Sequence, residues 1–158
     1  MSIKKIINPW IDTQGFNCIA CCPTNKQGLH LEFFEEGDDI FTRWKPNDDF
    51  QGWMDTLHGG IQALLIDETA GWVVCRKLQT TGVTSKMEIQ YLKPVSTKLD
   101  HLTVRARIAR TMRNLAFIDA EVYDSDGTVC TKASLLFFCA SKEKAAKELG
   151  FTACEVEE

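Results

Sequence analysis

The feature that most constrains this chain is the segment 61–74, which is apolar almost throughout. Its only polar side chains are Gln62, Asp67, Glu68 and Thr69, and three of these four are consecutive. A helix that is apolar on nearly every side belongs in a protein core rather than on a surface. Burying an ionised carboxylate is unfavourable unless another group pairs with it or uses it. The segment therefore predicts a central helix and marks its two acids as candidates for a functional site.

Strand patterns flank this helix on both sides. Before it, Leu29–Glu36 alternates apolar and polar residues, and after a turn residues 40–44 predict the returning strand of a hairpin. After it, β-branched and aromatic residues predict four consecutive strands, over 82–92, 99–110, 115–123 and 129–139. Strands grouped apart from one long helix, here about 58–76, predict an α+β fold in which an antiparallel sheet wraps around that helix.

The two ends of the chain are predicted to be accessory to this core. Residues 1–28 read as a helical or irregular lead-in that ends in a turn. Ser141 and Gly150 are a helix cap and a helix stop, so a short helix is expected between them, with a frayed acidic tail over 151–158. A length of 158 residues fits one domain that folds without cross-links.

Composition narrows the classes of function. The hydrophobic fraction of 44% and the charged fraction of 25% are those of an ordinary soluble globular protein. A net charge of -4 argues against nucleic acid as the main partner. Neither a signal peptide nor a run long enough to span a bilayer is seen, so a cytoplasmic protein without a membrane partner is expected.

Seven cysteines without a secretory signal predict free thiols in a reducing compartment. Cys18 and Cys21 have C-x-x-C spacing, but a zinc site needs a second pair of ligands at useful spacing. A redox pair would open a helix after a strand, whereas a turn follows at 23–28. The pattern therefore favours thiols that pack in a core or a turn over metal or redox chemistry.

His58 and Asp67 are nine residues apart on the predicted helix. At about 100° and 1.5 Å per residue, they point to opposite sides of the helix and lie roughly 13 Å apart along its axis. One chain therefore cannot easily bring both to one small substrate, whereas two antiparallel copies of the helix can. The pattern predicts a homodimer with two composite sites.

The start of the helix is chemically useful, because Gly59 and Gly60 leave its backbone amides unshielded. Such amides carry partial positive charge and stabilise an oxyanion, while a carboxylate acts as a general base or a nucleophile. These parts suit acyl transfer or hydrolysis. Structural interpretations stay open: a capping histidine, glycines of an ordinary turn, and acids that pair with Arg76 or with a lysine of a second copy. For Glu68 the structural interpretation is favoured.

These residues resemble the signature of the hotdog-fold acyl-CoA thioesterases, in particular the branch of the phenylacetate-pathway thioesterase and the human thioesterase superfamily members. That signature is His-Gly-Gly followed by an acid nine residues after the histidine, here His58-Gly59-Gly60 and Asp67. The strand segment Gly82–Pro94 and the lead-in segment Cys18–Leu29 are also similar to the family. The resemblance covers roughly residues 15–140.

The resemblance implies hydrolysis of an acyl-CoA thioester to free acid and CoA between two copies of the chain, with no metal and no organic cofactor. A homodimer is expected, and a dimer of dimers (a homotetramer) is compatible with it. The catalytic residues implied are Asp67 as base or nucleophile, the Gly59 amide as oxyanion donor, His58 at the helix start and the Thr84 hydroxyl.

Substrate contacts are expected from Gly60, Glu68 and Ser85, the last being the neighbouring candidate for the assisting hydroxyl. For the CoA phosphates the candidates are Arg110 and Arg113, ahead of Lys93 and Lys142.

Gly52 stands where some relatives carry an asparagine, and neither Gln51 nor Asp55 is an obvious replacement. The missing asparagine keeps open a non-catalytic acyl-CoA binding or regulatory protein of the same fold. The acyl group is not specified by these residues.

Overall fold

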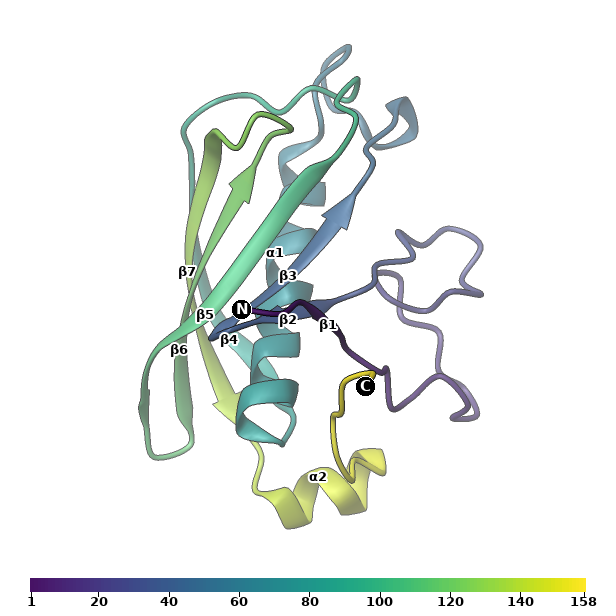
Figure 1. Cartoon of the computed structure of the whole chain (residues 1–158), viewed down its shortest axis with the longest axis vertical. Coiled ribbons are helices and arrows are strands. Elements are labelled where there is room, and N and C mark those ends of the chain that lie inside the picture. The colour runs from purple at the N-terminus through teal and green to yellow at the C-terminus, as the bar shows by residue number, and fades with distance from the viewer.

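A computed structural model describes residues 1–158. Figure 1 shows a curved sheet with the long helix α1 against one of its faces. The sheet has seven strands in the order β1-β2-β3-β5-β6-β7-β4, with antiparallel neighbours throughout. Helix α1 covers Gly59–Val73 and continues as a π-helical turn, Val74–Leu78. The predicted α+β hotdog architecture is confirmed.

The strands have the bounds β1 Lys4–Lys5, β2 Phe34–Glu36, β3 Asp39–Trp44, β4 Gly82–Tyr91, β5 Leu102–Met112, β6 Leu115–Tyr123 and β7 Val129–Cys139. A short 3-10 turn, Asp48–Phe50, precedes α1, and the second helix α2 covers Lys142–Leu149. The strands predicted over 115–123 and 129–139 have the observed bounds.

The core lies between α1 and the sheet. Leu65, Ile66 and Val73 of α1 are fully buried. Alternation along β6 brings four residues into the same core, namely Ala116, Ile118, Ala120 and Val122. Each buried leucine or isoleucine side chain contributes about 1.5–3 kcal/mol of transfer free energy. Because this packing fixes how α1 is rotated against the sheet, it also fixes where the two acids of the helix point.

Strand β4 is an edge of the sheet, and its outer side has no partner in the chain. Its pairing with β7 shifts register between Thr84 and Lys86. Most of β4 is exposed, including Val83 at 68%. An open edge of this kind presents a row of backbone groups that can pair with another chain.

The strand predicted over 29–36 is shorter in the structure, whereas the lead-in follows the irregular alternative of its prediction. Only the last three of these residues join the sheet, as β2. The reason is that Leu29 and Leu31 donate backbone hydrogen bonds to the lead-in, at the carbonyls of Ile19 and Ala20. The lead-in itself forms turns and the short β1, with no helix.

The tail after α2 is packed, which makes the prediction of a frayed tail wrong. Phe151 and Cys154 are buried, and Val156 forms an antiparallel bridge with Ile6. Arg76 donates to the carbonyl of Cys154 over 2.8 Å. The acidic composition indicated exposure, but Phe151 and Cys154, which precede the acids, anchor the tail against the core.

Helix α2 has the predicted ends, since Ser141 accepts from the amide of Lys144 and Gly150 adopts a φ of 65°. All seven cysteines are free thiols, as predicted. Neither α1 nor α2 has the length and apolar composition that crossing a membrane requires.

Candidate active site

Helix α1 begins at a His-Gly-Gly sequence whose amides are almost all satisfied. His58 is the N-cap, and its Nδ1 accepts from the Gly60 amide over 2.8 Å. The amides of Ile61 and Gln62 donate to the His58 carbonyl. The Gly59 amide has no partner in the chain, which makes it the one free donor of the first turn. A free amide at a helix N-terminus attracts an anion or a developing oxyanion.

The ring of His58 is exposed and keeps one nitrogen free. Because Nδ1 accepts the Gly60 amide, a neutral ring carries its proton on Nε2. A hollow of about 380 Å³ opens at this point, lined by Asp49, Phe50, Gln51, His58, Gly60 and Ile61. The free amide and the Nε2 proton are therefore two neighbouring donors at the start of α1.

Tyr91 of β4 holds the first residue of the helix. Its hydroxyl donates to the Gly59 carbonyl over 2.8 Å. A Cβ at Gly59 would lie 3.3 Å from the Tyr91 ring and hydroxyl, and a Cβ at Gly60 would lie 3.1 Å from Nδ1 of His58. Since both contacts are tight, glycine at these positions preserves the geometry of the helix start.

Asp67 lies in the middle of α1 and contacts the edge strand. The Thr84 hydroxyl donates to its carboxylate over 2.5 Å. Asp67 takes part in no ion pair of the chain. Ser85 is exposed, beside Thr84 at the register shift, and makes no hydrogen bond to either acid. A half-buried carboxylate that a hydroxyl orients and no cation neutralises can take a proton from water or attack a carbonyl carbon.

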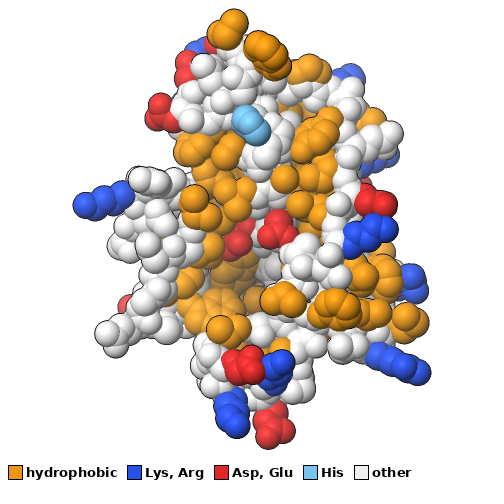
Figure 2. All heavy atoms as spheres, turned by 180° about the vertical axis from the view of Figure 1, so that it is seen from behind, with side chains coloured by type: hydrophobic (Ala, Val, Ile, Leu, Met, Phe, Trp, Pro, Cys, Tyr) orange, Lys and Arg blue, Asp and Glu red, His pale blue; other side chains and the backbone are white.

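The helix start and Asp67 are separate places within one chain. Nine residues of helix put His58 and Asp67 about 13 Å apart along the axis of α1. Figure 2 shows acidic side chains in a hollow near the centre of the α1 face, rimmed by hydrophobic side chains. The structure therefore brings His58 together with Gly59 and Gly60, and Asp67 together with Thr84, but it does not unite the two groups.

Glu68 points to the lead-in instead of the edge strand. Its carboxylate accepts from Trp72 Nε1 over 3.1 Å and from the Cys18 thiol over 3.6 Å. Burial raises the pKa of Glu68 to about 7, and the charge of the Cys18 sulfur adds to the rise. The pair with Arg76 does not form, since Arg76 binds Glu35. The two consecutive acids of α1 thus contact different parts of the chain: Asp67 contacts the edge strand β4, and Glu68 contacts the lead-in.

The arginines expected to hold the CoA phosphates lie at the β5–β6 hairpin, near the C-terminal end of α1 (Figure 1). The guanidinium of Arg110 stacks on Phe117, 3.8 Å from the ring centroid. Arg113 lines a hollow of about 440 Å³ together with Leu78 and Lys142. Arg113 therefore shares a basic hollow with Lys142 rather than with Arg110.

Sequence reasoning missed the contact of Tyr91 with Gly59 and the meeting of Cys18 and Cys21 with Glu68. The signals were the tyrosine of the Tyr-Leu-Lys-Pro corner and the C-x-x-C spacing. Cys18 and Glu68 are 50 residues apart, so only the fold shows that they meet.

The thioesterase superfamily model matches residues 54–131, which include all of α1, β4, β5 and β6. A curated protein of Saccharolobus solfataricus, named "Putative esterase", is 33% identical over 79 residues. This match covers 49% of the chain and 51% of that protein, so the chain spans about half the length of the curated relative.

Solved structures show the same fold. A thioesterase superfamily protein superposes with a TM-score of 0.71 at 20% identity, over 77% of this chain and 59% of that one. A hypothetical thioesterase protein of Streptococcus pneumoniae, solved with coenzyme A, has a TM-score of 0.65 at 25% identity, over 70% of this chain and 86% of that one. The same S. pneumoniae protein is also solved with a threonine and with an aspartate replaced by alanine.

Proposed function

We propose that this chain, which has the hotdog fold and matches the thioesterase superfamily model over residues 54–131, hydrolyses an acyl-CoA thioester to free acid and CoA. One observation carries the proposal: α1 offers a free amide at Gly59 and an acid at Asp67 that Thr84 orients and no cation neutralises. Hydrolysis of a thioester needs both, a donor for the oxyanion and a base or nucleophile for the carbonyl carbon.

In the proposed reaction the thioester oxygen accepts from the Gly59 amide and from Nε2 of His58. Asp67 takes a proton from water while the water oxygen bonds to the carbonyl carbon. The C–S bond then breaks, and the departing CoA thiolate receives that proton. If Asp67 attacks the carbon itself, an anhydride forms, CoA leaves, and water releases the acid. Both routes use the hydrogen bond from Thr84 to orient the carboxylate.

Two copies supply one site in this proposal. Joining the open β4 edges of two chains about a two-fold axis sets their α1 helices side by side and antiparallel. The start of one helix then faces the middle of the other, which closes the gap of about 13 Å that separates the two groups in one chain. The exposed position of Thr84 on that edge supports this arrangement.

A CoA ester is proposed as the substrate class because the S. pneumoniae neighbour was solved with coenzyme A. The phosphates of CoA are proposed to contact Arg113 and Lys142, which line one hollow. The first experiment measures thiol release from a panel of acyl-CoA esters that differ in acyl group. Turnover of at least one ester is expected. Binding of acyl-CoA without turnover of any would instead indicate the non-catalytic protein, which the glycine at position 52 favours.

Mixing two impaired variants tests the composite site, with the residual activity of each variant alone as the background. Asp67→Asn and Gly59→Ala chains are unfolded together, refolded and assayed. A mixed dimer contains one doubly defective site and one intact site, so random pairing restores about a quarter of wild-type activity. No recovery from the mixture would place both groups of the site in one chain and exclude the composite arrangement.

A further inference from the structure

Three ligand-bearing side chains meet where the lead-in packs on α1. The sulfurs of Cys18 and Cys21 and a carboxylate oxygen of Glu68 all lie within 4.8 Å of one another. Cys21 is buried, and the other two are half-buried. A hollow of about 220 Å³ borders all three. The proposed hydrolysis uses none of them, so the cluster needs its own explanation.

The turn between the two cysteines presents N–H groups to sulfur. The Cys22 amide donates to the Cys18 carbonyl over 3.0 Å and closes the turn. The Ala20 amide donates to the Cys18 sulfur over 3.3 Å, and Asn8 Nδ2 donates to the Cys21 sulfur over 3.8 Å. Such donors stabilise a thiolate, the form that binds a metal ion.

No cation of the chain neutralises this cluster. Glu68 is absent from the ion pairs, and no lysine or arginine lines the hollow. Negative ligands grouped away from water are unfavourable unless a positive charge joins them. Two sulfurs and one oxygen select a soft divalent ion, since Mg²⁺ and Ca²⁺ prefer oxygen alone.

We propose that Cys18, Cys21 and Glu68 bind one Zn²⁺ ion, with water from the adjacent hollow as the fourth ligand. Zinc bond lengths of about 2.3 Å to sulfur and about 2.0–2.2 Å to oxygen put tetrahedral ligand atoms about 3.5–3.8 Å apart. Ligand atoms already within 4.8 Å reach that spacing through side-chain rotation. Binding displaces the thiol protons of Cys18 and Cys21 into solvent.

The ion would clamp the lead-in to α1 one residue away from Asp67. Without it, the Cys18 thiol contacts the helix through a single hydrogen bond of 3.6 Å. Trp72 Nε1 stays on Glu68 as an outer donor that orients the ligating carboxylate. The proposed role of the ion is to hold the lead-in in place, and the site stands whether or not the chain hydrolyses thioesters.

Cobalt titration of the reduced, metal-free full chain tests the proposal without any substrate. We expect one Co²⁺ per chain, with thiolate-to-cobalt charge transfer in the near ultraviolet and d–d bands of tetrahedral intensity. Zn²⁺ should then displace the cobalt at one equivalent. Absence of thiolate charge transfer in the wild type would overturn the proposal, and so would a Cys18–Cys21 disulfide that forms readily in a protein that binds no metal.

Variants assign the ligands. Cys18→Ser and Cys21→Ser are expected to weaken Co²⁺ binding at least about 100-fold, and Glu68→Gln at least about 10-fold with charge transfer kept. Cys139→Ser is the matched control, because Cys139 is a half-buried free thiol outside the cluster. Zn²⁺ should raise the Tm of wild type and Cys139→Ser most and that of Glu68→Gln less, and it should leave the Tm of Cys18→Ser and Cys21→Ser unchanged. Equal cobalt affinity in Cys18→Ser and Cys139→Ser would exclude the site. If Cys18→Ser does not fold, Glu68→Gln provides the test. An unchanged Co²⁺ affinity in Glu68→Gln would overturn the three-ligand site.

Discussion

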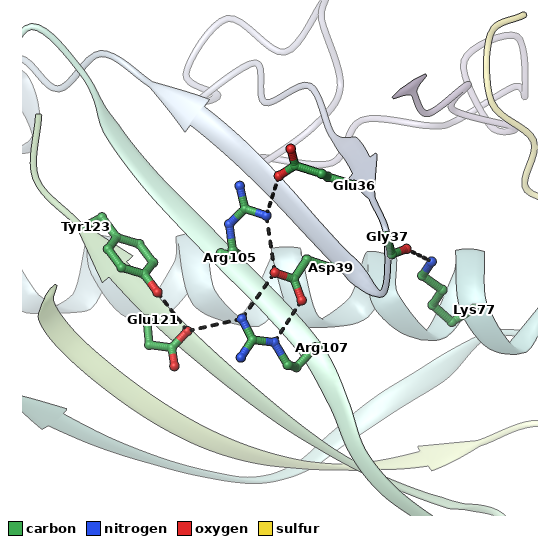
Figure 3. A network of polar contacts seen from close by, with 8 residues as sticks. All are labelled: Glu36, Gly37, Asp39, Lys77, Arg105, Arg107, Glu121 and Tyr123. Atoms are coloured by element: carbon green, nitrogen blue, oxygen red, sulfur yellow. Dashed lines mark hydrogen bonds and ion pairs between the residues drawn. The ribbon is translucent and has the colours of Figure 1, made fainter. Parts of the chain in front are cut away.

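The acids on the outer face of the sheet and the acids on α1 are held in opposite ways. On the outer face, Asp39 accepts hydrogen bonds from both Arg105 and Arg107 (Figure 3). On α1, Asp67 accepts from a hydroxyl, and Glu68 accepts from a thiol and an indole. Both regions contain partly buried carboxylates, but only the first contains the cations that neutralise them.

The difference separates carboxylates that complete the fold from those that the fold leaves incomplete. Burial alone raises the pKa of Asp39, but hydrogen bonds from Arg107 and Arg105 outweigh it and hold that pKa below its usual range. Burial raises the pKa of Glu68, where no cation opposes it. An acid without its cation is where a substrate, a second chain or a metal ion can complete the interaction.

Exchanging the acids for amides gives the largest contrast between the two regions. Asp67→Asn is expected to lower the turnover of an acyl-CoA ester at least about 100-fold, in the range for loss of a catalytic base. Its Tm should stay close to that of the wild type, because no cation loses a partner. Asp39→Asn should show the reverse, with turnover kept and Tm lowered. Wild-type turnover in Asp67→Asn would remove this carboxylate from the mechanism.

The next largest effect on turnover is expected from a side chain added at the start of α1. Gly59→Ala puts a Cβ 3.3 Å from the Tyr91 ring, so the first turn of α1 must shift and its free amide with it. We expect turnover to fall roughly 10-fold or more. The double variant Gly59→Ala/Tyr91→Ala restores room at the same place and should recover part of the activity. Full turnover in Gly59→Ala alone would show that the close approach of Tyr91 does not matter.

Local sequence patterns predicted the helix and strands that carry the candidate site. The features that the sequence did not predict depend on contacts between segments far apart in the chain. The bounds of β6 and β7 follow from alternation within each strand. The strand expected at 29–36 is shorter, because Leu29 and Leu31 pair with the lead-in, which has no strand pattern. The separation of His58 from Asp67 follows from helix geometry alone. The meeting of Cys18 with Glu68 joins segments 50 residues apart, and no spacing rule reaches that far.

Removing the hydroxyl that orients Asp67 gives a smaller effect than removing the acid. Thr84→Val keeps the shape of the side chain but deletes the donor to Asp67. Turnover is expected to fall about 10-fold, with Thr84→Ser close to wild type. Ser85→Ala tests the other candidate hydroxyl on the same edge strand, since Ser85 makes no hydrogen bond to either acid of α1. An equal loss in Ser85→Ala and Thr84→Val would point to the strand edge rather than to the hydroxyl.

The smallest effect concerns stability on the outer face of the sheet. The pKa of Asp39 is lower in the folded protein than its ordinary value of 3.8, so its contribution to the free energy of unfolding is fully present above that value. The contribution is lost as pH falls through the lowered pKa. Asp39→Asn should therefore lower the free energy of unfolding at pH 7 by about 1 kcal/mol, as measured by urea unfolding. The difference in this free energy between wild type and Asp39→Asn should shrink below about pH 4. Asp38 is an exposed neighbour, and the control variant Asp38→Asn should change neither the free energy of unfolding nor its pH dependence. If the difference in the free energy of unfolding stays constant down to about pH 2, packing rather than charge stabilises Asp39. The contrast between the two regions would then rest on Asp67 and Glu68 alone.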